Sequence, residues 1–593
     1  MEAVLPRRYG RAEAPRGQEG RWPKSDSRRL PALPCTSAGL RQLDFVSEGN
    51  GLHNGTGFGR SIMKSHNPRQ HTSEFLPGCA RSCKKASLLL AGLATMLFVP
   101  LALGASPAAD CSKLLGLKLK DTVITGAAVI AAKGDVPEYC RVQGGLETVI
   151  LFEVALPVSA WNTKFFYVGG GGYNGSIPEL SDALARGYAA AGSDTGHRGF
   201  HWDASAMYDN PQSQVNYAHR ATHLVALLAK EVVKTYYGMP ARRSYFCGCS
   251  NGGKMALMEV QRYPDDFDGL VAGGAVVDRT KAMMMFDWTQ RALLGSEIPP
   301  YKIPAMEKAT LAACDAKDGL ADGLIDRPDK CAFDPKVLTC AGADNANCLT
   351  PKQVTAWQKI LNGPVDSAAK RLYVGYSAGH EGDYPDYITG LGTMHGYPSS
   401  NFMYEDSFMR WIVFGPKFDS VRDFDYDKSQ ESLIPFEKDQ DAANTDLSAF
   451  KAHGGKLILY NGWADHSTPP LRSVQYYNDV RQKHGEATDE YVRLFMMPGL
   501  YHCSGGPGPN TFGGLGQKGY RKNDPENDII GALDRWVDQG VAPTKLIATK
   551  FKDDDPRQGV ARTRPVCPYP QVATYKGSGS VDDAANFVCG SSK

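Results

Sequence analysis

The sequence predicts an α/β fold, in which helices cover both faces of a mainly parallel β-sheet and a second domain is inserted into the chain that builds the sheet. Short apolar runs alternate with amphipathic stretches over residues 106–276, and the alternation returns over residues 444–593. Residues 277–443 lack this alternation and are rich in Asp, Gly, Pro and aromatic side chains. We therefore expect a core formed by the two outer ranges and an inserted lid domain formed by the middle range.

Individual strands and helices of the core can be placed from their hydrophobic pattern. Residues 164–168 (Lys-Phe-Phe-Tyr-Val) form a largely apolar run with the length of a buried strand. Residues 217–237 repeat apolar side chains on one face of a helix. By the same reasoning, we expect strands at 243–247, 455–460 and 491–497, and helices at 253–263 and 529–540.

The balance of charges excludes one class of function. The 593 residues include 66 Lys and Arg against 64 Asp and Glu, which gives a net charge of +2. A nucleic-acid-binding protein needs Lys and Arg clustered on one surface, and no such stripe follows residue 106. We therefore expect no nucleic-acid partner, and nothing in the sequence indicates an oligomeric state.

The N-terminal part of the chain differs from the rest. Residues 1–83 are rich in Arg, Gly, Pro and Ser, which predicts disorder or a start codon placed too early, with Met63 as a candidate true start. Residues 84–105 have the charged, apolar and small-residue order of a secretory signal peptide. A single membrane anchor is the alternative. We favour the signal, and so expect a secreted or periplasmic protein without a stable membrane partner.

Export changes how the cysteines are interpreted. Eleven of the 14 cysteines follow the expected cleavage site, so in an oxidising compartment most should be paired, with one left over. Cys314 with Cys331 and Cys340 with Cys348 are close enough in sequence to form local disulfides. No C-x-x-C pair repeats at the spacing of a zinc site.

A candidate nucleophile lies between an expected strand and an expected helix. The segment Gly248-Cys249-Ser250-Asn251-Gly252 fits G-x-S-x-G, which in this context lifts the serine hydroxyl clear of the sheet on a sharp turn. Outside such a context the pattern is usually a plain turn. The backbone N–H of Asn251 would face the site where an oxyanion forms. Ser250 is therefore the predicted nucleophile.

The partners of this serine are predicted from chain order. In α/β-hydrolases the nucleophile is followed by an acid and then by a histidine. Asp465 and His502 each lie just after an expected strand, at the sheet edge where such folds place their sites. His466 is a rival base, although its position beside Asp465 makes a mutual hydrogen bond awkward. We prefer His502, since it follows the last strand of the expected order.

Two further features support this arrangement. Cys249 precedes Ser250 and Cys503 follows His502, so a disulfide between the cysteines would tie the nucleophile to the base. Residues 169–172 are four consecutive glycines directly after the strand at 164–168. Gly172 is the expected second oxyanion donor, and a flexible loop is the alternative.

These motifs resemble those of the tannase and feruloyl esterase family of secreted serine esterases. The segments at 499–508 (Gly-Leu-Tyr-His-Cys-Ser-Gly-Gly-Pro-Gly) and 561–570 (Ala-Arg-Thr-Arg-Pro-Val-Cys-Pro-Tyr-Pro) are similar to its histidine segment and C-terminal signature, and the resemblance covers 111–589. It implies an α/β-hydrolase core with a large lid inserted between nucleophile and acid. It also implies the disulfides Cys111–Cys140, Cys249–Cys503, Cys314–Cys331, Cys340–Cys348 and Cys567–Cys589, with Cys247 free.

The lid contains a candidate metal site at residues 314–326 (Cys-Asp-Ala-Lys-Asp-Gly-Leu-Ala-Asp-Gly-Leu-Ile-Asp). Closely spaced carboxylates suit calcium, but the spacing is not that of an EF-hand, and a cluster of Asp-Gly turns is the alternative. The family resemblance implies a structural Ca²⁺ at this segment. Its implied ligands are the side chains of Asp315, Asp318 and Asp322 with the carbonyl oxygens of Leu320 and Leu324.

The substrate is expected to be a small aromatic ester. The lid is rich in aromatic side chains on which gallate, ferulate or similar phenolic acids could stack: Phe402, Tyr404, Phe408, Trp411 and Phe414. The alternative is that these residues belong to the lid core, as most lid aromatics are expected to do. Residues 407–415 resemble a stretch of the terephthalate monoester hydrolase in this family, where an arginine holds the free carboxylate of the substrate. Arg410 stands at the matching place, and a guanidinium can bind a carboxylate through two hydrogen bonds. This chain differs after Asp465, where His466-Ser467-Thr468 lacks the aromatic residue that the terephthalate enzyme has nearby.

The sequence therefore predicts a serine esterase of the tannase and feruloyl esterase type. The alternatives are a terephthalate monoester hydrolase, and, in another class, a catalytically silent, calcium-stabilised binding protein of the cell envelope.

Overall fold

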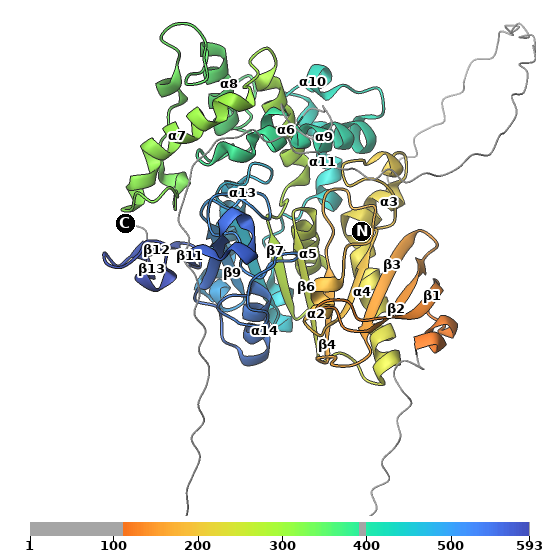
Figure 1. Cartoon of the computed structure of the whole chain (residues 1–593). Helices are drawn as coiled ribbons and strands as arrows, with labels where there is room; N and C mark the ends of the chain where they lie inside the picture. The colour runs from red at the N-terminus through yellow and green to blue at the C-terminus, as the bar shows by residue number, and fades with distance from the viewer. Residues whose placement is uncertain (1–110, 391–398, 592–593) are drawn as a thin grey trace, which may run out of the picture. The chain divides into compact units, whose positions relative to one another are not determined.

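The computed structural model describes residues 111–390 and 399–591, so the expectations for residues 1–83 and 84–105 lie outside the described residues. A nine-stranded sheet forms the core, in the order β1-β2-β3-β5-β4-β6-β7-β8-β9 (Figure 1). The strands are β1 (Thr122–Ile130), β2 (Tyr139–Leu146), β3 (Ile150–Pro157), β4 (Lys164–Val168), β5 (Ala189–Ser193), β6 (Arg243–Cys249), β7 (Gly269–Gly273), β8 (Lys456–Gly462) and β9 (Val492–Met497). From β5 across to β9 neighbouring strands are parallel, and β1, β2, β3 and β5 pair antiparallel.

Both faces of the sheet are covered, which explains why β4 is apolar on both sides. Phe165 and Tyr167 point into one hydrophobic cluster, and Phe166 and Val168 point into another. The first cluster lies under α4 (Ala221–Tyr237), α5 (Asn251–Arg262), α12 (Ser448–His453) and α13 (Pro470–His484). The second lies under α2 (Ser181–Ala185) and α14 (Ile529–Gln539). The predicted α/β class is therefore confirmed.

The predicted elements are present, with shifts at their ends. The helix expected at 217–237 starts with a π-helical turn, Asn216–Arg220, after a short α3 (Pro211–Val215). The helix expected at 253–263 begins at Asn251, because the chain turns into α5 directly after Ser250. The hydrophobic pattern did not reveal the antiparallel strands β1–β3 or two small C-terminal sheets. Those sheets pair β10 (Leu546–Phe551) with β11 (Val560–Val566), and β12 (Gln571–Tyr575) with β13 (Phe587–Ser591).

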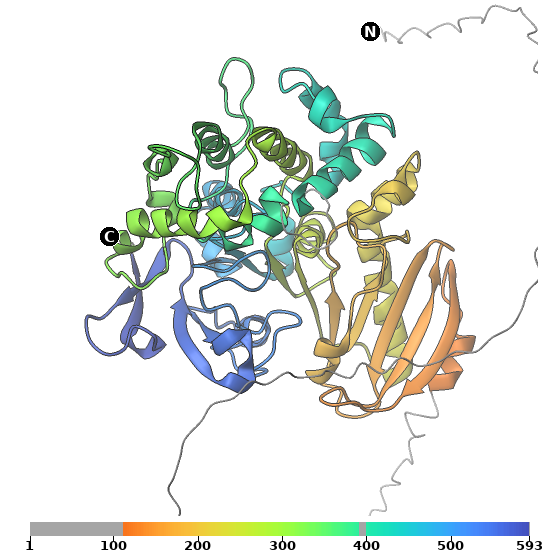
Figure 2. The same ribbon diagram turned by 45° about the horizontal axis from the view of Figure 1, so that its top comes forward.

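The chain between β7 and β8 is mostly helical and has its own apolar core. Its main helices, grouped together in Figure 2, are α6 (Arg279–Leu293), α7 (Ile303–Cys314), α8 (Pro351–Asn362), α9 (Ser400–Phe408), α10 (Ser420–Asp423) and α11 (Ser429–Gln440). Trp357 and Phe408 are fully buried among them, and the cluster also includes Tyr173, from the loop after β4, and Tyr217, from the π-helical turn before α4. This segment, which we call the lid, is thus packed against the site loops. Among the described residues, no helix is both long and apolar enough to span a bilayer.

Candidate active site

Ser250 occupies a tight turn between β6 and α5. Its backbone has φ 62° and ψ −122°, a conformation that non-glycine residues rarely adopt. A Cβ on Gly248 would lie 2.6 Å from the Gly252 carbonyl, so only glycine fits the turn there. The turn is held because Ser250 N–H donates to the Gly273 carbonyl at 2.9 Å. This is the strained strand–turn–helix geometry that presents a nucleophile above a sheet.

Asp465 and His502 lie together at the carboxyl ends of β8 and β9. His502 Nδ1 is 2.9 Å from Asp465 Oδ2, and Asp465 is fully buried. The other carboxylate oxygen accepts the N–H groups of Ser467 at 2.9 Å and Thr468 at 2.8 Å, and the Thr468 hydroxyl donates to Oδ2 at 2.6 Å. Since a carboxylate can only accept, Nδ1 of His502 carries the proton and Nε2 is left as the acceptor.

The electrostatics of this pair favour a charged imidazole. Burial lowers the pKa of His502, but the charge and the hydrogen bond of Asp465 raise it by more, so the pKa lies above its usual value of 6.5. An imidazole with a raised pKa is a stronger proton acceptor. His502 is therefore equipped to take a proton from a hydroxyl group.

A disulfide joins the loop of His502 to the turn of Ser250. Cys249 and Cys503 are bonded, with their Cα atoms 5.9 Å apart, and they directly adjoin Ser250 and His502 in sequence. Within the described residues the Ser250 hydroxyl forms no hydrogen bond to His502. Such contacts often tighten only when substrate binds. The disulfide nevertheless fixes the two loops against each other.

The rival base His466 is engaged elsewhere. Its Nδ1 contacts Asp383 of the lid at 2.5 Å, and both residues are buried. The ring of Tyr384 lies edge-on to His466, with ring centroids 4.7 Å apart. Asp465 therefore pairs with His502 rather than with its neighbour in sequence, as the preference for His502 requires.

A buried hydrogen-bond network connects the two expected oxyanion donors. The Tyr217 hydroxyl lies 3.0 Å from the Gly172 carbonyl and 2.9 Å from Asn251 Oδ1. Arg279 Nη2 donates to Tyr217 at 2.7 Å and to Asn251 Oδ1 at 2.8 Å, and Arg279 is 2% exposed. The buried guanidinium thus holds Tyr217 and the Asn251 side chain, and Tyr217 extends the network to the Gly172 carbonyl. Tyr217 and Arg279 were not predicted as site residues, because nothing local in the sequence connects them.

The conformation of Gly172 is set by the loop that follows β5. Gly172 has φ 57°, and a Cβ there would lie 2.1 Å from the carbonyl oxygen of His201. The next residue, Tyr173, donates its backbone N–H to the same carbonyl at 2.6 Å. His201 in turn bonds through Nδ1 to the hydroxyl of Tyr404 in the lid, at 2.7 Å. The glycine run is therefore a held turn rather than a flexible loop.

Aromatic side chains of the lid reach these loops. The ring of Tyr387 lies edge-on to His502 with centroids 5.6 Å apart, and Tyr404 adjoins Tyr173 with centroids 6.0 Å apart. Of the lid aromatics expected to stack on substrate, Phe408 is fully buried in the lid core. Tyr387 was not anticipated, because its π-helical turn carries no hydrophobic periodicity that points to the site.

Arg410 is already paired on its own segment. Its guanidinium bonds the carboxylate of Asp406 through Nε at 3.2 Å and Nη2 at 2.5 Å, and Nη1 lies 3.4 Å from the Pro416 carbonyl. A substrate carboxylate would have to displace Asp406. The geometry therefore does not favour the carboxylate-binding role.

The acidic segment of the lid folds as turns held by its own carboxylates. Asp315 accepts N–H groups of Asp322 and Gly323, and Asp318 accepts those of Leu320 and Asp326. Asp322 also contacts Arg564 from β11. The segment has more acceptor oxygens than donors to match them, since Oδ1 of the buried Asp326 has no hydrogen-bond partner. Burial raises the pKa of Asp318 to about 6 and that of Asp326 to about 7.

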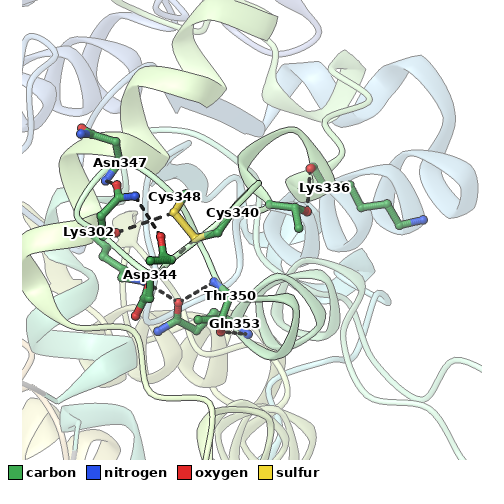
Figure 3. Close-up of a disulfide and its surroundings, with 11 residues drawn as sticks. Lys302, Lys336, Cys340, Asp344, Asn347, Cys348, Thr350 and Gln353 are labelled. Atoms are coloured by element: carbon green, nitrogen blue, oxygen red, sulfur yellow. Dashed lines mark hydrogen bonds and ion pairs between the residues drawn. A yellow bond between two sulfur atoms is a disulfide. The ribbon is translucent and has the colours of Figure 1, made fainter.

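All five expected disulfides are present, and Cys247 is free and buried. Figure 3 shows Cys340–Cys348, beside which the buried Lys302 contacts Asp344 and donates to Gln353 Oε1 at 2.8 Å. Cys340, Asp344 and Cys348 lie within ligand distance of one another. Because the two sulfurs are bonded to each other, this group is a disulfide and not a metal site.

Comparison with known proteins agrees with this geometry. The family model described as tannase and feruloyl esterase matches residues 133–590. The chain is 37% identical to an uncharacterized esterase of Xanthomonas campestris pv. campestris, over 85% of this chain and 96% of the relative. It is 32% identical to the mono(2-hydroxyethyl) terephthalate hydrolase of Piscinibacter sakaiensis, over 78% and 86% of the two chains. The crystal structure of feruloyl esterase B from Aspergillus oryzae matches with a TM-score of 0.73 at 26% identity, over 82% of this chain and all of that one.

Proposed function

Because the chain belongs to the tannase and feruloyl esterase family, and is therefore a carboxylic ester hydrolase, we propose that it hydrolyses esters of aromatic acids with Ser250, His502 and Asp465 as its catalytic triad. One observation carries this proposal. The imidazole that bonds the buried Asp465 stands on a loop that a disulfide joins to the nucleophile turn. Family membership shows that the chain is an esterase. The triad, the acyl-enzyme intermediate and the aromatic acid are our inference.

In the first half of the reaction, His502 Nε2 takes the proton of the Ser250 hydroxyl as its oxygen attacks the ester carbonyl carbon. Asp465 keeps the Nδ1 proton in place and stabilises the imidazolium that forms. The protonated His502 then gives its proton to the alcohol as the C–O bond breaks. Water next attacks the acyl-enzyme by the same steps, and the free acid leaves.

Charge that develops on the carbonyl oxygen is met by the backbone N–H groups of Gly172 and Asn251. Each such donor is worth about 3 kcal/mol of transition-state stabilisation in serine hydrolases. Their positions depend on Tyr217, which bonds both segments, and on Arg279, which bonds Tyr217 and the Asn251 side chain.

An aromatic acyl group is favoured by the side chains that the lid brings to the site. Tyr387 lies against His502, and Tyr404 against the loop of Gly172. Aromatic rings prefer the offset and edge-on contacts that such walls provide. The paired Arg410 gives no support to a terephthalate monoester as the substrate, and family membership does not favour a catalytically silent binding protein.

We also propose that the lid holds a structural Ca²⁺. Asp315, Asp318 and Asp322 with the carbonyls of Leu320 and Leu324 are an all-oxygen donor set of the kind that calcium prefers. Among the described residues these carboxylates do not form a group whose ligand atoms all lie within 4.8 Å. The unpartnered oxygen of the buried Asp326 still supports a cation here. The ion would hold the lid segment and supply no step of the reaction.

The five disulfides support a location outside the cytoplasm, because bonds of this kind persist in oxidising compartments. The secreted or periplasmic location remains our proposal.

The test is an assay of the purified chain on methyl gallate, methyl ferulate, chlorogenate and a terephthalate monoester, combined with labelling by a serine-directed phosphonate. We expect turnover of at least one phenolic ester, and one label on Ser250. Ser250→Ala should lose the label and lower kcat by about 10⁴-fold or more. Hydrolysis that persists in Ser250→Ala, or a label on another residue, contradicts the proposed triad.

A further inference from the structure

A second cluster of ionisable side chains lies on the outer side of the core, between α4 and α5, the pair of helices that cover one face of the sheet (Figure 1). His223 comes from the first turn of α4, Glu259 from α5, and Asp266 from the loop that leads into β7. One ligand atom of each side chain lies within 4.8 Å of the other two. The proposed mechanism uses none of these residues.

Glu259 is the unusual member of the cluster. Its side chain is 1% exposed, and neither carboxylate oxygen has a hydrogen-bond partner. An unpaired buried carboxylate costs several kcal/mol. Lys230 lies nearby, but its ammonium donates to the backbone carbonyl of Asp266, and within the described part of the chain it makes no ion pair with either carboxylate. Burial raises the pKa of Glu259 well above its usual value, and the neighbouring Asp266 raises it further, whereas Lys230 offsets only part of this effect.

The other two members are held in place and reachable. His223 Nδ1 lies 2.6 Å from Asp266 Oδ2, and the His223 ring stacks on Tyr263 with centroids 3.9 Å apart. The Tyr263 hydroxyl is itself bonded to His219 at 2.8 Å. The His223 side chain is 25% exposed, whereas Asp266 is buried. A small ion can thus enter from the His223 side.

We propose that His223, Glu259 and Asp266 bind one divalent transition-metal ion of the zinc class. One imidazole nitrogen and two carboxylate oxygens, with water at the fourth position, are a donor set that zinc accepts. Zinc–ligand bonds of about 2.0 Å place the ligands of a tetrahedral site roughly 3.3 Å apart. The ion takes the place of the proton between His223 Nδ1 and Asp266 Oδ2, and the neutral imidazole then carries its one N–H on Nε2, on its solvent side. The partly exposed His223 ring then moves outward by a fraction of an ångström.

This site is distinct from the proposed calcium site in its ligands and its place. Calcium prefers oxygen alone, and an imidazole ligand selects against it. Glu259 follows Ser250 by nine residues on α5, which is about 13 Å along the helix. The ion therefore does not touch the reacting atoms. It joins α4 to the helix that begins at the nucleophile, and so its effect is on stability.

The experiment uses the full mature chain, freed of metals and then held in excess Ca²⁺, titrated with Zn²⁺ alone by calorimetry. We expect one Zn²⁺ per chain, a rise in the unfolding temperature, and an unchanged kcat. Co²⁺ in place of Zn²⁺ should give visible d–d absorption from a site with a nitrogen ligand.

Two variants and one control decide the result. His223→Ala and Glu259→Gln should each weaken Zn²⁺ binding by about 100-fold or more and abolish the Co²⁺ absorption. Glu259→Gln keeps the size of the buried side chain and removes the carboxylate ligand, so its metal-free form should unfold at no lower temperature than the parent, which separates loss of metal from loss of fold. The control is His453→Ala: His453 is 28% exposed and lies 3.3 Å from Asp265, but has no third ligand. It should bind Zn²⁺ like the parent.

The proposal is overturned if the parent binds no Zn²⁺ in the presence of Ca²⁺. It is also overturned if His223→Ala binds Zn²⁺ as tightly as the parent does. Neither result depends on ester hydrolysis, so this proposal and the proposed function fail separately.

Discussion

Replacing Cys249 and Cys503 together by alanine should cost both stability and catalysis, for two separate reasons. The disulfide closes a segment of 254 residues. In the chain-entropy description a loop of that length restricts the unfolded state enough to contribute about 5 kcal/mol to stability. In the folded state, the same bond keeps the His502 loop against the Ser250 turn. A displacement of the base by about 1 Å lowers the rate by about 100-fold.

The assay compares urea unfolding and methyl ferulate hydrolysis at a temperature well below the unfolding transition of each variant. We expect a loss of about 5 kcal/mol in unfolding free energy and a fall of about 100-fold in kcat with little change in KM. The matched control is Cys340→Ala with Cys348→Ala. That bond closes only 8 residues of the lid, away from the triad, so its loss should cost about 2.5 kcal/mol and leave kcat unchanged.

The two effects are separable in the outcome. If the Cys249/Cys503 double variant is destabilised but keeps a kcat within twofold of the parent, the disulfide does not position the base, and the argument is refuted. If both double variants lose kcat equally, the loss follows from stability and not from geometry.

Three further predictions follow from the site. Tyr217→Phe, which removes the hydroxyl that braces both oxyanion donors, should lower kcat about tenfold at constant KM, since one buried hydrogen bond of this kind is worth about 1.5 kcal/mol; an unchanged kcat would show that Arg279 alone suffices. In pH profiles, kcat/KM should fall with decreasing pH through a pKa above 6.5, because His502 must be neutral to act as base and its pKa is raised. Asp465→Asn removes the main raising effects and leaves burial opposed only by the charge of Asp383, so that limb should move to lower pH; a limb that stays in place would assign it to another group. Removal of Ca²⁺ by a chelator should lower the unfolding temperature of the parent, and Asp318→Asn should lose this dependence; a parent insensitive to the chelator would argue against the ion.

Much of the active-site candidate could be predicted because its parts are local in sequence. A G-x-S-x-G pattern between an apolar strand and a helix already implies a sharp turn, and the structure has Ser250 at φ 62° in such a turn. Asp465 and His502 follow β8 and β9 directly, and parallel neighbouring strands bring their carboxyl ends to one edge. Cys249–Cys503 was expected from the motifs, and Cys314–Cys331 and Cys340–Cys348 from their closeness in sequence, whereas Cys111–Cys140 and Cys567–Cys589 came from the family resemblance alone.

Other parts could not be predicted, because they depend on how distant segments pack. Arg279 begins the first lid helix and Tyr217 lies in a π-helical turn, 62 residues earlier, yet they share Asn251 as a partner. The ring of Tyr387 reaches His502 from a lid turn that has no apolar periodicity.

The sequence by itself determined the class of fold and the turn on which Ser250 lies, and it predicted the order of nucleophile, acid and base. These follow from hydrophobic period, from glycine at crowded backbone positions and from chain order, each of which acts over a few residues. Only the tertiary structure decided which histidine pairs with Asp465 and that Arg410 is already paired with Asp406. It also placed Glu259, buried and without a hydrogen-bond partner, beside His223. Hydrogen bonds and ion pairs act over only a few ångströms, so their partners are chosen by packing and not by position along the chain.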